Sequence, residues 1–242
     1  MVFQSSKLDL MFGQATGRLL KWSAATGRTS TLMSGMWFAN GISLDHSGDA
    51  LLVAETFEFR VHKYYIRGPR SGTHHVFLHD LPGPVDGISH AGDTGYFVTI
   101  PAVRTAIYSA AVPLVWVRRA ISLLPLHLWP PADPYGLVLF VQEVDAGVTL
   151  SSEPHLLGSG VETAAASGHE AGSSSGTVGV VQGSMHDPDG HAVATITSAT
   201  VSSKNGGDVF LGGISSNSLR RLPAAVWRAF VQQLEDETNN AA

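Results

Sequence analysis

Apolar and polar residues alternate in short runs along most of the chain, and glycine-containing turns separate the runs. Alternation with a period of two predicts β-strands that bury one face. The clearest case is residues 37–56, where one run leads through Ser47-Gly48-Asp49 into a second. Glycine in a short polar turn between two such runs is typical of a β-hairpin. We therefore predict a hairpin at 37–56 and an all-β fold.

The same hairpin pattern recurs along the chain. Residues 85–98 repeat its Gly-Ile-Ser and Gly-Asp landmarks, so that Asn40 and Asp86 occupy equivalent positions 46 residues apart. A weaker third copy lies at 195–211. A repeat of about 40 to 50 residues that consists of strands is the signature of a β-propeller blade. We expect four short strands in each blade.

Other segments complete the predicted organisation. Residues 144–177 are rich in Gly, Ser, Ala and Glu, which predicts a disordered loop. From Pro223 to Leu234 the apolar residues recur at helical spacing, which predicts a short C-terminal helix followed by a polar tail. Residues 1–222 would then form a partial propeller, and 223–242 the helix and tail. Further strands are predicted at 17–22, 29–33, 57–66, 74–79, 135–141 and 178–181, and a turn at 186–190.

Between residues 102 and 131 the composition changes to Ala, Leu and Trp, with Arg118 and Arg119 in the middle. The spacing favours one or two amphipathic helices, a short helical insertion laid over the end of the propeller. Four prolines divide this stretch into pieces too short to cross a bilayer. Two interpretations stay open. The helices either pack only on their own domain or contact a membrane surface.

Composition excludes several classes of function. Of the 242 residues, 44% are hydrophobic, which is enough for a substantial core. The net charge is −5 and the 15 Lys and Arg residues are scattered, so we expect no nucleic-acid partner. There is no cysteine, which excludes disulfides and thiolate metal sites. The N-terminus shows no basic region followed by an apolar one, so no signal peptide is visible.

The repeat also suggests candidate chemistry. Equivalent positions of successive blades face the same central channel, so the side-chain oxygens of Asn40 and Asp86 should converge there. Such oxygens suit a hard cation such as Ca²⁺, which takes six to eight of them. The alternative is that both side chains cap strand starts by accepting backbone N–H bonds.

No catalytic residue is assigned, because no Ser-His-Asp spacing appears and the eleven histidines are dispersed. The pair His74-His75 on a predicted outer strand is interpreted as surface rather than as a catalytic dyad. Glu55 follows a buried strand, where it either bonds a turn or lines the channel, and we favour the structural role.

Several motifs resemble the strictosidine synthase-like family. Its last blades are matched by 134–139, 186–190 and 211–217. Its characteristic region is matched by Thr16–Trp22, Phe38–Ile42, Val53–Thr56, Arg60–Tyr64, Gly68–Thr73 and Leu81–Gly83. The resemblance implies a six-bladed β-propeller related to paraoxonases and other calcium-dependent lactonases. It also implies that this chain is an incomplete propeller without the N-terminal blades.

The resemblance further implies a function. Asn40 and Asp86 correspond to calcium ligands of the lactonases, which implies a calcium-dependent hydrolase of small-molecule esters or lactones, with arylesterase-like activity. Family members imply an endomembrane or secretory location. Strictosidine synthase uses a glutamate in its last blade, whereas residues 198–205 contain no carboxylate, so strictosidine synthesis is not expected. The alternative is a non-catalytic, membrane-associated propeller scaffold or an inactive fragment.

Overall fold

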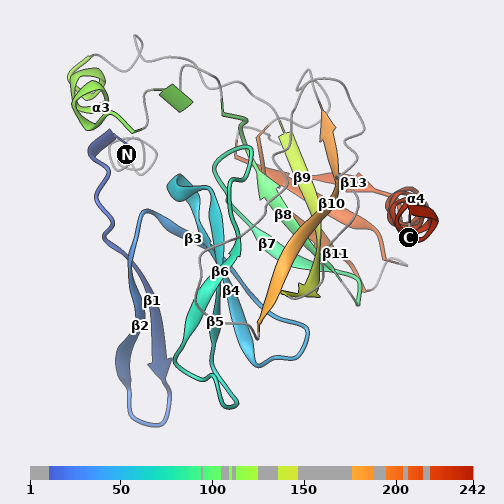
Figure 1. The fold of residues 1–242 in the computed structure, drawn as a ribbon, viewed down its shortest axis with the longest axis horizontal. Coiled ribbons are helices and arrows are strands. Elements are labelled where there is room, and N and C mark those ends of the chain that lie inside the picture. The colour runs from blue at the N-terminus through green and yellow to red at the C-terminus, as the bar shows by residue number, and fades with distance from the viewer. Residues whose placement is uncertain are drawn as a thin grey trace.

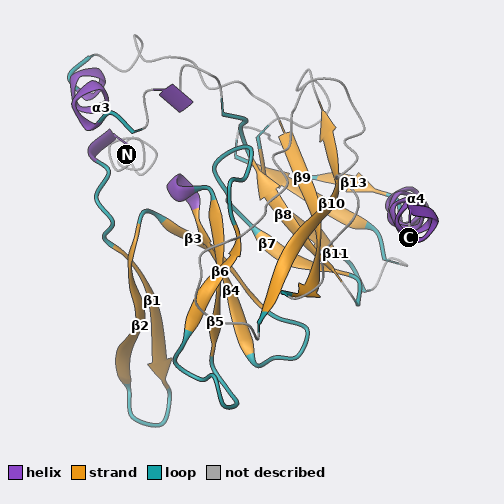
Figure 2. Ribbon diagram, viewed as in Figure 1, coloured by secondary structure: helices purple, strands orange, loops and turns teal. Residues whose placement is uncertain are grey.

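The computed structural model describes residues 11–93, 95–104, 109–110, 113–124, 136–146, 176–187, 195–203, 207–214 and 219–241. In these residues the strands form four antiparallel sheets (Figures 1 and 2). The first sheet pairs two strands, β1 (Gly17–Ser23) and β2 (Arg28–Met36). The second sheet is a four-stranded meander: β3 (Ala39–Leu44), β4 (Ala50–Glu55), β5 (Arg60–Tyr65) and β6 (His74–Leu78).

The third and fourth sheets follow the same plan. The third sheet comprises β7 (Ile88–Ala91), β8 (Gly95–Ile100), β9 (Gly136–Asp145) and β10 (Thr177–Asp187). The fourth sheet comprises β11 (Ile196–Val201), β12 (Val209–Gly213) and β13 (Arg220–Leu222). Two α-helices are described, α3 (Val115–Ser122) and α4 (Ala224–Ala241), with a 3₁₀ turn, η1, at Thr56–Glu58.

The sheets succeed one another as blades do, with their first strands side by side. Strand β7 contacts both β3 and β11, and Figure 1 shows the four sheets in chain order across the molecule. This confirms the predicted all-β, incomplete propeller-like fold. The three hairpin copies are also confirmed, because Gly48, Gly92 and Gly207 turn at equivalent places with φ of 73°, 75° and 90°. Only glycine adopts this left-handed conformation without a steric penalty.

The hydrophobic core lies between the faces of neighbouring sheets. Strands β8 and β9 are buried on both faces, which explains their nearly continuous apolar sequences. Helix α4 covers the third and fourth sheets with Trp227 and Leu234. Buried residues of the second and third sheets meet in one cluster that includes Leu52, Val61, Phe77, Tyr96, Val98 and Leu139. A smaller cluster joins the first and second sheets through Leu19, Met33, Val53 and Tyr64.

The inner strands approach so closely that two positions require glycine. The Gly41 amide donates to the Asp86 carbonyl at 2.9 Å, and a Cβ on Gly41 would lie 2.1 Å from that oxygen. A Cβ on Gly87 would lie 2.5 Å from the Thr197 carbonyl oxygen. Real Cβ atoms do not approach oxygen this closely, so the Gly-Ile-Ser landmark of the repeat marks the contact between neighbouring blades.

Several element boundaries differ from the sequence prediction. Strand β5 begins at Arg60 rather than at 57, because η1 and Phe59, with a φ of 54°, turn the chain first. Strands β9 and β10 include residues 144–145 and 177 of the predicted loop, and 147–175 lie outside the described residues. Of the predicted turn at 186–190, His186 and Asp187 end β10, and 188–190 lie outside the described residues.

The helical predictions are also revised in extent. Helix α4 continues to Ala241 instead of ending near Leu234. Within 102–131 the longest described helix is α3, and 125–131 lie outside the described residues. Among the described residues, no helix is both long and apolar enough to cross a membrane.

The contact at Gly41 leads to a stability prediction. We expect Gly41→Ala to lower the free energy of unfolding by about 1–3 kcal/mol, because the new Cβ forces β3 away from Asp86. Gly176→Ala is the matched control, since its nearest neighbour would lie 3.5 Å away in ordinary contact. Urea denaturation measures both. Equal stability of the two variants would show that the inner strands separate without a penalty.

Candidate functional site

Asn40 and Asp86 lie together where β3 and β7 begin. The side chain of Asn40 hydrogen-bonds the carboxyl group of Asp86. Burial raises the pKa of Asp86, and the hydrogen bond from Asn40 only partly opposes this effect. The two residues, here called the axial pair, therefore converge as the 46-residue repeat predicts.

The third repeat places a threonine, Thr197, near this pair instead of an Asn or Asp. Thr99 of β8 donates its hydroxyl to the Thr197 carbonyl at 2.9 Å and accepts the Gly87 amide at 2.8 Å. Thr197 supplies a hydroxyl where the earlier repeats carry Asn40 and Asp86. In the described parts of the chain, no three His, Cys, Asp or Glu side chains group as a metal site would require. The axial pair could thus provide two ligands of a larger set.

Glu55 has a structural role at the same end of the second sheet. Its carboxylate accepts bonds from the Trp37 amide at 2.6 Å, from Arg60 Nε at 2.7 Å and from His62 Nε2 at 2.7 Å. Burial alone would raise the pKa of Glu55, but these donors lower it to about 2. All the contacts are within the second sheet and the segment leading into it, which supports the structural interpretation.

The two adjacent histidines have separate environments. His74 is exposed, whereas His75 is half-buried and donates from Nε2 to the Thr177 carbonyl at 2.7 Å. Burial lowers the pKa of both rings. Because neighbouring residues on a strand point to opposite faces, the pair is not arranged as a dyad.

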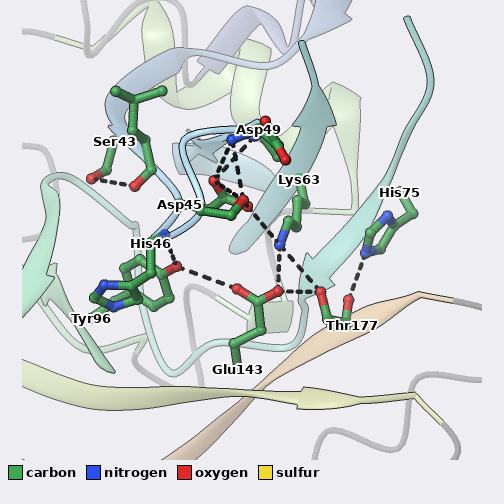
Figure 3. A network of polar contacts seen from close by, with 12 residues as sticks. Ser43, Asp45, His46, Asp49, Lys63, His75, Tyr96, Glu143 and Thr177 are labelled. Carbon is green, nitrogen blue, oxygen red and sulfur yellow. Dashed lines mark hydrogen bonds and ion pairs between the residues drawn. The ribbon is translucent and has the colours of Figure 1, made fainter. Parts of the chain in front are cut away.

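A cleft of about 530 Å³ lies at the opposite end of the sheets, between the hairpin loops of the second and third sheets. Figure 3 shows the polar network that forms part of it. The cleft is lined by Asp45, His46, Ser47, Asp49, Lys63, Tyr65, Arg67, Gly68, Pro69, Arg70, Asp93, Glu143 and Thr177. It is therefore separate from the axial pair, which lies where the inner strands begin.

The centre of this network is Lys63 of β5, whose side chain is only 3% exposed. Its ammonium group lies 3.1 Å from Asp45 Oδ2, donates to Thr177 Oγ1 at 3.2 Å and pairs with Glu143 Oε1. Three partners match the three N–H bonds of an ammonium group. Tyr96 adds a bond to Glu143 Oε2 at 3.3 Å. The network thus joins β5 to β9 and β10.

Asp45 also organises the turn between β3 and β4. Its Oδ1 accepts the amides of Asp49 at 2.9 Å and Ala50 at 3.1 Å. Burial raises the pKa of Asp45, but the bonds from Ala50, Ser47 and Lys63 outweigh it and lower the pKa.

Sequence reasoning did not identify Asp45, Lys63 or Glu143 as a group. The available signal was Lys63, a charged residue within the alternating run that became β5. Glu143 directly precedes the segment predicted to be disordered, and it lies 80 residues from Lys63. Such a distant pairing has no local pattern.

We predict that Lys63→Met destabilises the fold by about 3 kcal/mol, because Asp45 and Glu143 lose their cation in a largely buried site. Arg67→Met removes a cation from the same cleft. Arg67 donates an exposed hydrogen bond to the Gly48 carbonyl, so its loss should change stability by less than about 0.5 kcal/mol. Urea unfolding at neutral pH compares them. If the two variants unfold at the same urea concentration, the Lys63 network does not hold the sheets together.

The lowered pKa of Glu55 predicts that the fold loses stability in acid. The folded-state pKa of about 2 lies below the usual 4.5, so the contribution is complete above pH 4.5 and is lost as the pH falls toward 2. The difference corresponds to roughly 3 kcal/mol. Glu55→Gln should therefore be less stable at pH 7 and lose less stability between pH 5 and 2. Glu58→Gln, at an exposed position nearby, should follow the wild-type profile, and an identical profile for Glu55→Gln would contradict the assignment.

Comparison with known proteins finds a family model and relatives that match parts of this chain. Residues 2–69 match the family described as Strictosidine synthase. Adipocyte plasma membrane-associated protein of Gallus gallus is 37% identical over 119 residues, covering 48% of this chain and 29% of the relative. Protein STRICTOSIDINE SYNTHASE-LIKE 2 of Arabidopsis thaliana is 30% identical over 152 residues, covering 58% of this chain and 40% of the relative.

A longer match extends over most of the chain. Adipocyte plasma membrane-associated protein of Bos taurus is 25% identical over 215 residues, covering 89% of this chain and 45% of the relative. The chain thus spans less than half the length of each of these three relatives. The family match over residues 2–69 and these relatives support the resemblance to the strictosidine synthase-like family.

Proposed function

We propose that this chain carries part of the calcium site of an ester or lactone hydrolase with arylesterase-like activity. The observation that supports the proposal is the convergence of Asn40 and Asp86. Burial raises the pKa of Asp86, and the hydrogen bond from Asn40 only partly opposes this effect. A bound cation would favour the ionised carboxylate at such a position.

The residues present fit part of a calcium ligand set. The Asn40 amide oxygen and the Asp86 carboxylate are both hard oxygen ligands. Calcium coordinated there would supply a Lewis acid for a substrate carbonyl and for the oxyanion formed from it. The bond from the Gly41 amide to the Asp86 carbonyl fixes the spacing of the two ligands. The other oxygens would come from outside the described residues or from water.

The second candidate is a propeller of the same fold that binds at membranes without catalysis. It is supported by the small number of candidate ligands in the described residues and by the name of two relatives, adipocyte plasma membrane-associated protein. An endomembrane or secretory location belongs to both candidates as a proposal. Strictosidine synthesis is not proposed, because residues 198–205 carry no carboxylate.

Calcium dependence separates the two candidates. In excess calcium the melting temperature of the wild-type chain should rise by a few degrees, since a ligand at a hundred times its dissociation constant stabilises by about 2.7 kcal/mol. Asp86→Ala should abolish the rise, and hydrolysis of an aryl ester should fall with it. Asp49→Ala, which removes an exposed carboxylate at the opposite end, should leave the rise intact.

Differential scanning fluorimetry in calcium and in EDTA gives the measurement, together with an aryl ester assay on the same samples. A melting temperature that responds to neither calcium nor EDTA would overturn the metal site. It would leave the non-catalytic candidate ahead.

A further inference from the structure

Helix α3 is oriented with Arg118 facing inward and Trp116 facing outward. Arg118 is only 6% exposed, and its guanidinium lies 4.6 Å above the centre of the Trp37 ring. Trp116 is 71% exposed and Leu123, just after the helix, 86%. A helix on the surface of a globular protein normally shows the opposite arrangement. The exposed face is therefore not explained by packing within the described fold.

Three exposed residues share one face of the helix. Trp116, Ala120 and Leu123 follow helical spacing, so they lie above one another along α3. Val117 and Ile121 occupy the side of Arg118 and are partly covered. Gly13 lies directly against the Arg118 guanidinium, on the buried side of the helix. We define the α3 patch as the exposed residues Trp116, Ala120, Leu123 and Leu124.

The orientation of the patch is fixed by contacts on the buried side. The guanidinium of Arg118 stacks on Trp37, and this arrangement is a cation–π interaction. The amide of Trp37 is in turn held by Glu55 Oε1 at 2.6 Å. Turning the apolar face inward would require Arg118 to leave Trp37, so this contact keeps the patch facing away from the described sheets.

The charges around the patch indicate what it binds. Between Asp93 and Asp133 the sequence contains no acidic residue but three arginines, although the whole chain has a net charge of −5. Arg119 is exposed beside the apolar face of α3. An apolar face with Trp and Leu, flanked by arginine and free of acidic residues, is complementary to a bilayer surface that contains anionic lipids.

We propose that the α3 patch docks on the surface of a membrane containing anionic lipids. Trp116 and Leu123 enter the boundary between headgroups and acyl chains, and Arg119 contacts lipid phosphates. Because Trp37 directly precedes β3, docking turns the end of the sheets that bears the axial pair toward the membrane (Figure 1). Only the consequence for substrates, a preference for esters that partition into lipid, rests on the proposed hydrolase function.

Co-sedimentation with vesicles tests the docking directly. The full chain is mixed with vesicles of phosphatidylcholine, with or without phosphatidylserine, in EDTA so that calcium cannot contribute. We expect binding to the vesicles with phosphatidylserine and weaker binding to the others. Trp116→Ser with Leu123→Ser should reduce binding at least about tenfold, because two inserted side chains are lost. Arg119→Glu should reduce binding to the anionic vesicles only.

Matched substitutions elsewhere control for exposed apolar surface in general. Trp22, 65% exposed on β1, and Leu219, 67% exposed before β13, are the same residue types at other sites. Trp22→Ser with Leu219→Ser should bind vesicles like the wild type, and both double variants should keep its melting temperature.

Three results would overturn the proposal. The first is no binding of the wild-type chain to either vesicle, and the second is an equal loss in the control variant. The third is self-association that disappears with Trp116→Ser and Leu123→Ser, which would assign the patch to a second copy. None of these results depends on calcium or on ester hydrolysis. The docking proposal can therefore fail while the proposed hydrolase function stands, and the hydrolase function can fail while the docking proposal stands.

Discussion

The close backbone contact between successive inner strands determines most of this structure. Gly41 lies against the Asp86 carbonyl, and Gly87 against the Thr197 carbonyl, at distances that leave no room for a side chain. With the inner strands this close, the sheets stack face to face and bury β8 and β9 on both sides. The same contact brings Asn40 to Asp86. The requirement for glycine and the meeting of Asn40 with Asp86 thus both result from the close contact between inner strands.

Two buried charged groups fix the second sheet at its opposite ends. Glu55 is held by three donors, and Lys63 by two carboxylates and a hydroxyl. Removing charges from water is unfavourable, and ion pairing commonly does little more than offset it. The network of Lys63 specifies which part of the third sheet packs on β5, since a shift in packing would leave an ammonium or a carboxylate buried without a partner. Specificity of packing, more than net stability, is the effect that this geometry supports.

The sequence predicts what depends on local pattern and misses what depends on distant pairing. Each hairpin carries its own signal in alternation and in a left-handed glycine such as Gly48, so the blades were predictable. The repeat then placed Asn40 beside Asp86 without any knowledge of coordinates. The partnership of Lys63 with Glu143 has no such signal. Apolar spacing also predicted a helix within 102–131, but it could not show which face is buried, because that depends on Trp37, far away in sequence.

A series of physical contacts connects helix α3 to the end of the second sheet that carries Asn40. Glu55 holds the Trp37 amide, Trp37 carries Arg118, and Arg118 sets the outward direction of the α3 patch. Because Trp37 lies just before β3, this series of contacts ends beside Asn40. A chain that kept the fold but lost its metal chemistry would still present the patch, since none of these contacts involves Asp86. The proposed membrane docking and the proposed hydrolysis therefore share one end of the molecule but depend on different residues, which would allow either to persist without the other.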